Sequence, residues 1–322
     1  MRVLVTGGAG FVGSHLVDGL LARGRNVVVL DDLSAVLHRP AAALPDRVTF
    51  IEGSVEDREA VREAARGCAE IYHLAAVVGV RRVVSSPART LRCAVRGTAN
   101  ACEAAAREGA LLLFASSSEV YGGGAVDPLR EDAPLPPPLP GPRGTYGRGK
   151  RLAEAIVRRA SPARGFPAII VRLFNVVGPR QVAQTGMVLP AFVARALRDR
   201  PLAIHGDGSQ RRCFAFVRDV VEDLLGLAGE PRARGDTVNV GREEETSIVD
   251  LARHVVERTG SRSSLRFVPL ERIPERRIGP PDRRRPSLER LRSLLGPRDT
   301  APLDAVIDAV TADVASRVLV EG

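Results

Sequence analysis

The sequence predicts an α/β fold in which helices cover both faces of a parallel sheet. The first observation is residues 1–32, where an apolar run, a glycine-rich turn, an amphipathic stretch and a second apolar run follow one another. The second is that strand-like and helix-like patterns keep alternating as far as about residue 175. Such alternation is typical of a Rossmann-type doubly wound parallel sheet, and the less regular remainder predicts a smaller C-terminal α/β region for the substrate.

The turn in the first unit has the glycines that a bound dinucleotide requires. Gly7 permits the tight turn, Gly10 lets the backbone approach a pyrophosphate, and Gly13 lets the helix pack closely on the strand. The helix N-terminus adds N–H donors and a partial positive charge. Asp31, at the end of the second run, is placed to accept hydrogen bonds from the adenosine ribose, which favours NAD over a 2′-phosphorylated cofactor. We expect NAD to be bound by Gly7, Gly10, Phe11, Val12, Gly13, Asp31, Asp32, Leu74, Ala75, Ala76, Tyr146 and Lys150.

The remaining elements follow in order along the chain. Strands are expected at 48–52, 70–74, 111–115 and 167–173, and helices at 58–66, 88–109 and 146–158. Shorter helices are expected at 190–196, 217–227 and 248–259. Right-handed crossovers would bring the carboxyl ends of the strands, and with them the ligands, to one edge of the sheet. These patterns predict an NAD-binding domain at 1–175 and a substrate-binding region at 176–322, with some chain crossing between the two.

Composition limits the other classes of protein. The chain of 322 residues has four cysteines without metal-ligand spacing, so we expect no metal site and reduced thiols in a cytoplasmic protein. Arg2 leads directly into the first strand and no apolar run is long enough to cross a bilayer, so neither a signal peptide nor a membrane span is expected. The net charge of +9 is spread along the chain, with no Trp and three Tyr, which argues against nucleic-acid binding and for a basic cleft that takes an anionic substrate.

Tyr146 and Lys150 are spaced to lie on one face of a helix, one turn apart. The ammonium group, together with the positive charge of bound nicotinamide, is expected to lower the pKa of the phenol toward the working pH. Tyr146 then acts as a general base that takes a proton from a sugar hydroxyl while hydride leaves the same carbon. A surface Tyr/Lys pair is the alternative, but this pair follows an NAD-binding unit and a serine cluster.

That cluster, Ser116 to Ser118, follows an apolar strand. A hydroxyl at the carboxyl end of a strand can hydrogen-bond the reacting oxygen and polarise a developing carbonyl. Serines also cap turns routinely. Ser117 and Ser118 are both candidates for the catalytic hydroxyl.

Six motifs occur in the order and spacing of one enzyme superfamily: TGGAGFVGSHL, YHLAA, SSSEVYG, Tyr-x-x-x-Lys, RLFNVVGPRQ and GDGSQRRCF. On these motifs, residues 1–295 resemble the extended short-chain dehydrogenase/reductases, and within them the nucleotide-sugar epimerase, dehydratase and decarboxylase group. The resemblance implies tightly held NAD, a UDP-sugar in the region 176–322, and a homodimer formed by helices such as 88–108 and 146–160. It implies substrate contacts from Asn175, Val188, His205, Arg212 and one arginine of the triplet 283–285, for which Arg283 is our candidate.

Glu119 gives the best indication of the reaction. UDP-glucuronate decarboxylases of this group show Ser-Glu-Val-Tyr-Gly, as here, and Arg212 in Arg-Cys-Phe also resembles their pattern. Oxidation at C4 makes the C6 carboxylate part of a β-keto acid, which loses CO₂ because the ketone accepts the electrons. Glu119 and Arg212 would then handle the carboxylate and the return of a proton. We therefore expect decarboxylation of UDP-glucuronate to UDP-xylose or a UDP-4-keto-pentose. A 4-epimerase acting on UDP-glucuronate or UDP-glucose and a non-catalytic NAD-binding sensor are the alternatives.

Four positions depart from the pattern of this group. Ala94 stands where relatives usually have Asn, and Ser54 where they usually have an Asp that contacts adenine. Gly147 and Gly149 are expected to loosen the helix of Tyr146, each costing about 1 kcal/mol relative to Ala. We therefore expect weaker retention of NAD, with partial release of NADH and a keto product.

Overall fold

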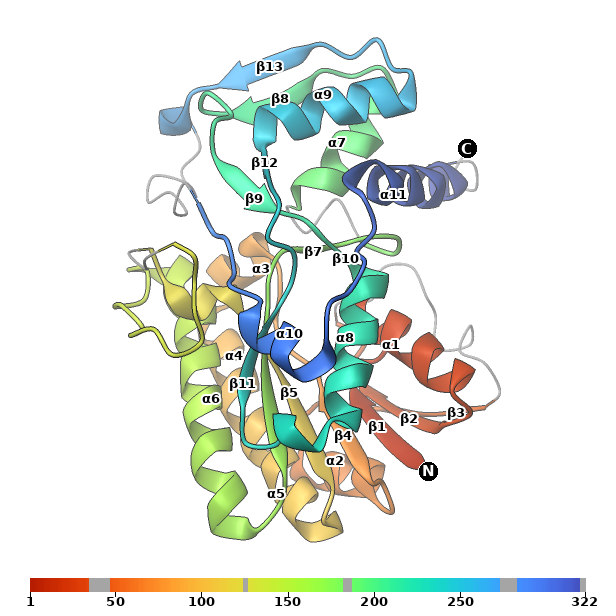
Figure 1. The fold of residues 1–322 in the computed structure, drawn as a ribbon, viewed down its shortest axis with the longest axis vertical. Coiled ribbons are helices and arrows are strands. Elements are labelled where there is room, and N and C mark those ends of the chain that lie inside the picture. Colours follow the sequence, from red (N-terminus) through yellow and green to blue (C-terminus); the bar gives the residue numbers. More distant parts are fainter. Residues whose placement is uncertain (35–46, 124–126, 182–186, 273–282, 319–322) are drawn as a thin grey trace.

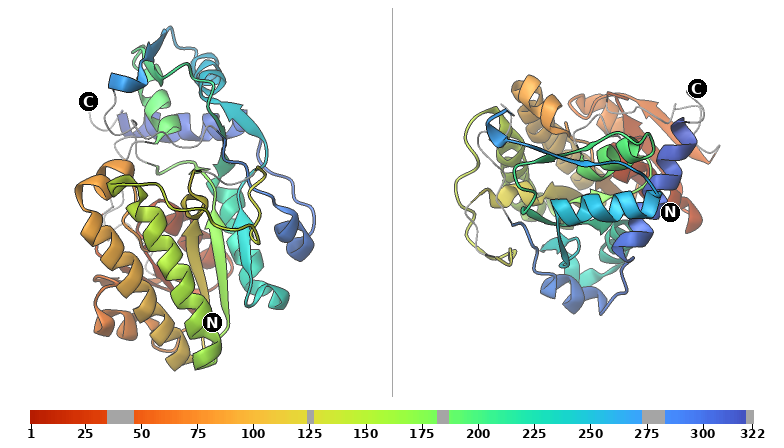
Figure 2. Two further views of the ribbon diagram at one scale, coloured as in Figure 1. Left: turned by 90° about the vertical axis from the view of Figure 1, so that its left-hand side faces the viewer. Right: turned by 90° about the horizontal axis from the view of Figure 1, so that it is seen from above.

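The computed structural model describes residues 1–34, 47–123, 127–181, 187–272 and 283–318. Figure 1 shows two parts, which we call the lower unit, built on the large sheet, and the upper unit, which contains α7, α9 and α11. The upper unit lies beyond the carboxyl edge of the sheet, and the side view in Figure 2 shows the same arrangement.

Seven strands of the described residues form one parallel sheet in the order β11-β6-β5-β4-β1-β2-β3. The strands are β1 (Arg2–Thr6), β2 (Asn26–Asp31), β3 (Val48–Glu52), β4 (Glu70–His73), β5 (Leu111–Ser117), β6 (Ala168–Leu173) and β11 (Thr237–Val240). The strand order reverses at the neighbouring pair β1 and β4, and ligands of such folds bind at the carboxyl ends beside this point. The sheet confirms the predicted α/β fold of the Rossmann type.

Helices cover both faces of the sheet because its strands alternate apolar side chains between two cores. Val3 and Val5 face a core shared with α1 (Phe11–Ala22), α8 (Val217–Gly229) and α10 (Glu289–Leu295). Leu4 faces the opposite core, which is covered by α2 (Arg58–Ala65), α5 (Thr98–Glu108) and α6 (Thr145–Arg164). The elements α8, α10 and β11 come from beyond residue 176 and yet belong to the lower unit. The domain limits at 175 and 176 themselves stay a prediction.

The upper unit has a core of its own, formed by α7 (Val188–Ala196), α9 (Ile248–Thr259) and α11 (Leu303–Val318). Strand β8 (Leu202–His205) pairs parallel with β13 (Leu265–Val268), and β9 (Arg211–Cys213) pairs antiparallel with β12 (Glu245–Ser247). Between the two units, β7 (Val176–Val177) pairs with β10 (Ala215–Phe216) (Figure 1). The predicted helix at 248–259 is therefore confirmed as α9.

Several predicted boundaries are wrong. The helix expected at 88–109 consists of α4 (Pro87–Arg92), a π-helix (Cys93–Gly97) and α5. Gly97 lies so close to Val55 that a Cβ there would be 2.7 Å from a Val55 methyl group. Strand β5 runs to Ser117 instead of ending at 115, and α6 ends at Arg164 instead of 158. The remaining short helices are α3 (Val80–Ser85) and 3₁₀ turns at Ser118–Tyr121, Pro142–Gly144, Pro231–Ala233 and Leu270–Arg272.

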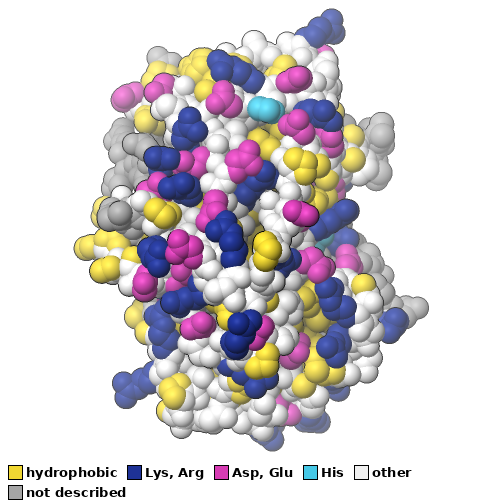
Figure 3. Space-filling view, viewed as in Figure 1, with side chains coloured by type: hydrophobic (Ala, Val, Ile, Leu, Met, Phe, Trp, Pro, Cys, Tyr) yellow, Lys and Arg dark blue, Asp and Glu magenta, His cyan; other side chains and the backbone are white. Residues whose placement is uncertain are grey.

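Basic and acidic side chains are interspersed over the face shown in Figure 3, so the positive net charge is not gathered into one patch on that face. Within the described ranges, no helix has the length and apolar character needed to cross a membrane. No group of three or more His, Cys, Asp or Glu in the same ranges is placed to hold a metal ion.

Candidate active site

The glycine turn after β1 has no room for side chains. Gly7 has a φ of +71°, and a Cβ on it would lie 2.9 Å from the backbone of Ala75. A Cβ on Gly13 would lie 2.1 Å from the carbonyl oxygen of Gly7. Gly10 caps α1 without a side-chain hydrogen bond, and the first turn, which contains Phe11 and Val12, has no acidic residue. The free N–H groups of this helix end fit a phosphate.

The end of β4 lies directly beside this turn. The N–H of Leu74 donates to the carbonyl oxygen of Thr6 at 3.2 Å, and the N–H of Ala75 donates to the Thr6 hydroxyl at 3.3 Å. These contacts hold β4 against β1 at the point where the strand order reverses. Leu74, Ala75 and Ala76 are therefore placed next to the glycine turn, as the predicted cofactor-binding set requires.

Asp31 ends β2 and is only 8% exposed. Its Oδ2 accepts from the N–H of Ala9 at 3.0 Å, and its Oδ1 accepts from the N–H of Leu33 at 2.9 Å. Burial raises the pKa of Asp31, while these backbone donors lower it. Each carboxylate oxygen can accept a further hydrogen bond, so the group still fits a ribose. It also fixes the glycine turn through Ala9, a role that the sequence did not indicate.

Two polar residues near Asp31 are engaged in contacts within the protein. Asp32 pairs with Arg89 of α4 at 3.0 Å. The Ser54 hydroxyl accepts from the N–H of Glu56 at 3.1 Å and so caps its own turn.

Gly147 and Gly149 lie at close contacts of helix α6, which is continuous, and the expected loosening of this helix stays a prediction. A Cβ on Gly147 would lie 2.7 Å from the carbonyl oxygen of Glu119. A Cβ on Gly149 would lie 3.1 Å from the methyl group of Ala94. The short residues let α6 approach both the end of β5 and the π-helix that contains Ala94.

Tyr146 and Lys150 lie one turn apart on α6, with Lys150 Nζ 5.8 Å from the centroid of the Tyr146 ring. The ammonium group is 3% exposed, donates to the carbonyl oxygen of Ala115 at 2.6 Å, and lies 4.8 Å from the Phe114 ring centroid. Burial lowers the pKa of Lys150 to about 8. Burial raises the pKa of Tyr146, although a hydrogen bond with Ser117 lowers it. The expected lowering of the Tyr146 pKa is therefore wrong for the protein chain alone, because desolvation of the phenol dominates.

The three serines after the apolar strand have different partners. Ser117 hydrogen-bonds Tyr146 and also accepts from the N–H of Glu119 at 3.2 Å. Ser116 points elsewhere and donates to Glu154 at 2.6 Å. Ser118 begins a 3₁₀ turn and is buried. Of the two predicted candidates, Ser117 is the one that meets Tyr146.

Glu119 meets an arginine that the sequence did not single out. Its Oε1 lies 2.5 Å from Nη1 of Arg284, which is 4% exposed. Arg283, the predicted candidate, instead pairs with Glu245 and lies 3.8 Å from Asp127. Arg285 pairs with Asp127, so it is the middle residue of the triplet that meets Glu119. The sequence carries no signal for which of the three arginines does so.

Asn175 follows β6 at the edge of the sheet and has a φ of +35°. Its Nδ2 is buried and has no hydrogen-bond partner among the described residues. A buried amide donor without a partner costs free energy, which a bound acceptor would remove. This orientation fits the expected contact with a substrate oxygen.

The other predicted substrate contacts come from three elements of the upper unit. Val188 begins α7, His205 ends β8, and Arg212 lies in the middle of β9 opposite Thr246 of β12. All three side chains are partly buried. Their assignment to the substrate stays a prediction.

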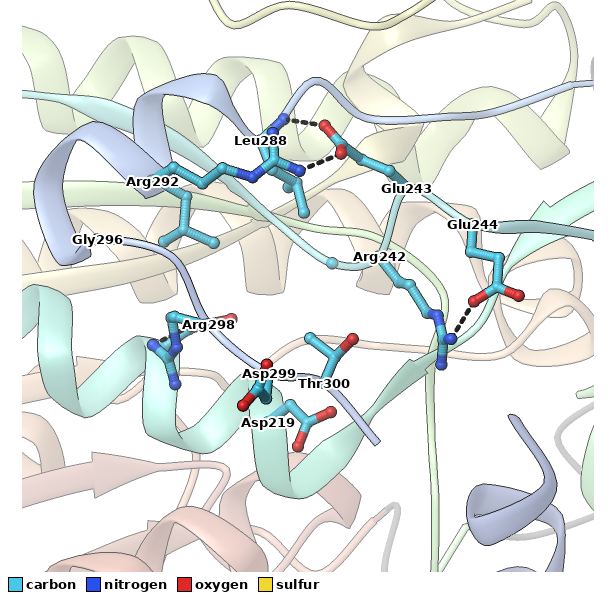
Figure 4. Close-up of a pocket in the computed structure, with 13 residues that line it drawn as sticks. Asp219, Arg242, Glu243, Glu244, Leu288, Arg292, Gly296, Arg298, Asp299 and Thr300 are labelled. Atoms are coloured by element: carbon cyan, nitrogen blue, oxygen red, sulfur yellow. Dashed lines mark hydrogen bonds and ion pairs between the residues drawn. The ribbon is translucent and has the colours of Figure 1, made fainter. Parts of the chain in front are cut away.

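A pocket of about 220 Å³ in the described structure lies apart from these residues, at the junction of the two units (Figure 4). It is formed by α8, α10, the loop after β11 and the segment that follows α10. Arg292 pairs with Glu243, and Arg242 pairs with Glu244 (Figure 4). No predicted site residue lines this pocket.

Fold and site together define a Rossmann-fold protein with a Tyr-x-x-x-Lys pair, its lysine buried, at the edge of its sheet. The model of the NAD dependent epimerase/dehydratase family matches residues 3–241. The chain is 34% identical over 308 residues to UDP-glucuronic acid decarboxylase 1 of Danio rerio, covering 94% of this chain and 70% of that protein. It is 32% identical over 296 residues to UDP-N-acetyl-alpha-D-glucosaminuronate decarboxylase of Bacillus cytotoxicus, covering 91% of each.

A solved structure of UDP-glucuronic acid 4-epimerase from Bacillus cereus, in complex with UDP-glucuronic acid and NAD, is also similar. The TM-score is 0.86 at 26% identity, with 98% of this chain and 100% of that chain covered. The protein belongs to the NAD dependent epimerase/dehydratase family and is an enzyme of the extended short-chain dehydrogenase/reductase class.

Proposed function

We propose that this enzyme uses NAD to decarboxylate UDP-glucuronate through a 4-keto intermediate, giving UDP-xylose, a UDP-4-keto-pentose or both. The observation that carries the proposal is the pair of Glu119 and buried Arg284, which lies beside the Tyr146 site. The names of the two decarboxylase relatives support it.

NAD fits the residues at the carboxyl edge of the sheet. The turn at Gly7 and Gly13 leaves room for a close backbone approach, the N-terminus of α1 offers free N–H donors, and Asp31 lies where a ribose would bind. The family description and the NAD in the similar solved structure support this cofactor. When bound, NAD would accept a hydride from C4 of the sugar and could return it later.

The first chemical step is the removal of the C4 hydroxyl proton by Tyr146. Lys150 would favour this step because a nearby positive charge stabilises the tyrosinate that precedes it. Ser117, already hydrogen-bonded to Tyr146, would donate to the same sugar oxygen as it becomes a carbonyl. The buried position of Lys150 keeps water away from this proton transfer.

The second step breaks the bond between C5 and C6. The C4 ketone takes the electron pair as an enolate while CO₂ leaves, and a proton is then added at C5. The planar guanidinium of Arg284 suits recognition of the departing carboxylate, and Glu119 is placed beside it to return the proton. We assign to Arg284 the carboxylate contact that the sequence had given to Arg212.

The diphosphate and the base would bind between the units. Asn175 offers its unpartnered amide donor, and Arg212 a guanidinium from β9. Val188 and His205 would contact the nucleotide. Arg283 stays a candidate for the diphosphate, although it is paired with Glu245 in the structure.

A 4-epimerase is the second candidate, because the similar solved structure is a UDP-glucuronic acid 4-epimerase. Both reactions begin with the same oxidation, and they differ in whether the bond between C5 and C6 breaks. The Glu119–Arg284 pair favours decarboxylation. The intact Tyr146 and Lys150 argue against a non-catalytic sensor.

The test is to incubate the purified enzyme with UDP-glucuronate and to analyse the products by mass spectrometry. We expect a nucleotide sugar lighter by the mass of CO₂, and no turnover by the variant Tyr146→Phe. An unchanged mass with a UDP-galacturonate product would instead establish the epimerase. Simultaneous measurement of released NADH shows whether the pentose leaves as the ketone, as weak retention of NAD would cause.

We also propose a homodimer formed by α4 and α6. Leu91 on α4 is 37% exposed and Leu152 on α6 is 49% exposed, which is unusual for large apolar residues of two helices packed side by side. Analytical ultracentrifugation tests this proposal, and we expect Leu152→Glu to give monomers. The four unpaired cysteines support a cytoplasmic location.

A further inference from the structure

We infer that a buried chain of hydrogen bonds, which runs from Glu154 through Arg172 and Tyr121 to Asn239, positions the two halves of the active site relative to each other. One half is the catalytic pair Tyr146 and Lys150 with Ser117, and the other is the Glu119–Arg284 pair. The inference rests on the proposed function in taking Tyr146 and Lys150 as the catalytic pair and the Glu119–Arg284 pair as the second half of the site.

The chain begins beneath the catalytic helix. Glu154 lies one helical turn after Lys150 on α6 and is fully buried. Its Oε1 accepts from the hydroxyl of Ser116 at 2.6 Å, and Ser116 directly precedes Ser117. This contact fixes the end of β5 against α6, and with it the place where Ser117 meets Tyr146.

Arg172 of β6 continues the chain. Its Nε and Nη2 each donate to Glu154 at 2.9 Å, in the two-pronged geometry that fixes both groups. Arg158 adds a further donor to Glu154 at 2.8 Å. Burying such a pair carries a large desolvation cost, and apolar residues often stabilise a core as well or better. A pair with this geometry under an active site therefore points to a positioning role.

Tyr121 and Asn239 carry the chain to the second half. Nη1 of Arg172 donates to the Tyr121 hydroxyl at 2.9 Å, and that hydroxyl donates to Oδ1 of Asn239 at 2.8 Å. Nδ2 of Asn239 then donates to the carbonyl oxygens of Leu129 and Ser287 at 2.9 and 3.3 Å. Both Tyr121 and Asn239 are fully buried.

Ser287 belongs to the short segment that places Arg284. The N–H of Ser287 donates to the carbonyl oxygen of Leu129 at 2.9 Å. The N–H of Leu129 in turn donates to the carbonyl oxygen of Arg285 at 2.8 Å. Leu129 and Pro286 form an isolated bridge between the two segments. The end of the hydrogen-bond chain is therefore held only a few residues from the guanidinium that meets Glu119.

The Tyr121 hydroxyl is the link that can be removed with least disturbance. It accepts one hydrogen bond and donates another, and a phenylalanine ring would keep the packing against Phe174. Tyr72 offers a matched control. It is equally buried, its hydroxyl donates to Glu70 at 3.0 Å, and it lies in the core on the other face of the sheet.

The experiment compares Tyr121→Phe with Tyr72→Phe in the full-length enzyme. We expect Tyr121→Phe to lower kcat about tenfold or more, because small misplacements of reacting groups have large effects. KM for the nucleotide sugar and the affinity for NAD should change by less than about threefold. Tyr72→Phe should keep the wild-type kcat while losing a similar amount of stability.

A second variant tests the Glu154 end without any substrate. The negative charge of Glu154 raises the pKa of Lys150, so Glu154→Gln should lower that pKa below its value of about 8. Competitive acetylation of Lys150 at several pH values, analysed by mass spectrometry, measures the change. Because Tyr121→Phe keeps the charge of Glu154, a shift of the Lys150 pKa in that variant reports a displacement of Glu154 along the chain.

Equal losses of kcat in Tyr121→Phe and Tyr72→Phe would overturn the inference. So would an unchanged pKa of Lys150 in the Glu154→Gln variant. Failure of the proposed function has a different signature. If the wild type epimerises UDP-glucuronate instead, the same comparison of kcat applies to that reaction. If no nucleotide sugar is turned over, the acetylation result still decides for or against the positioning chain.

Discussion

Two arginine–carboxylate pairs in this enzyme have a buried carboxylate and differ in what surrounds it. Glu154, one helical turn from Lys150 of the proposed catalytic pair, accepts hydrogen bonds from Ser116, Arg158 and two nitrogens of Arg172. Although burial raises its pKa, these partners bring the pKa of Glu154 below its ordinary value. Asp223, at the junction pocket, pairs with Arg298, yet burial raises its pKa to about 7.

The difference shows that burial alone does not decide whether a carboxylate stays ionised. Asp223 shares α8 with Asp219 and Glu222, whose negative charges raise its pKa further. Its partner Arg298 belongs to the segment between α10 and α11, which also contacts α8 where the N–H of Ala301 donates to Asp219 at 2.9 Å. Glu154 therefore keeps its charge beneath the proposed catalytic pair. Asp223 instead titrates near neutral pH, at the place where the chain passes between the two units.

The largest expected effect is the difference in stability lost when Arg172 or Arg298 is replaced by leucine. Arg172→Leu leaves the charge of Glu154 buried without its main partner, and we expect a loss of about 3–5 kcal/mol in the free energy of unfolding. Arg298→Leu, measured at about pH 6, should cost only about 1 kcal/mol, because Asp223 is then largely protonated and the neutral carboxyl gains little from the ion pair. Urea denaturation of the two variants measures both values. Similar losses in the two variants would show that the carboxylates do not differ in ionisation.

The sequence predicts features that depend on neighbouring residues better than contacts between residues that are distant in the chain. The strand at 48–52, the helix at 248–259 and the Rossmann order of elements follow from local periodicity and glycine spacing, and the structure has them. Arg284 was missed because the choice within an arginine triplet depends on which side chain the folded segment turns toward Glu119. The Glu154–Arg172 pair was missed because its two members come from different elements and meet only in the folded core.

The second expected effect compares a glycine of α6, the helix of Glu154, with a glycine of α8, the helix of Asp223. Gly147→Ala would place a methyl group 2.7 Å from the carbonyl oxygen of Glu119, so the end of β5 or the helix must move. We expect a loss of about 1–3 kcal/mol in the free energy of unfolding, together with a lower kcat. Gly229→Ala at the end of α8 is the control, since it meets no atom within 4 Å and should stabilise by about 0.5–1 kcal/mol. A Gly147→Ala variant with wild-type stability and kcat would contradict the close packing of α6 on Glu119.

The last expected effect is the pH dependence of stability that Asp223 contributes. Its pKa is raised from 3.8 to about 7 on folding, so the folded state holds the proton more tightly than the unfolded state. The resulting stabilisation is present at low pH and is lost as the pH rises toward about 7, by at most about 1.4 kcal/mol per pH unit. Glu154 has the opposite sign, because its lowered pKa gives stability that is lost only when the pH falls below its ordinary value of 4.5. Asp223→Asn should therefore flatten the fall in the urea midpoint between about pH 5 and about pH 7, where Glu154 stays ionised in both proteins. If wild type and Asp223→Asn change in parallel over this range, Asp223 is ionised like Glu154, and the junction pair is as fixed as the one beneath the active site.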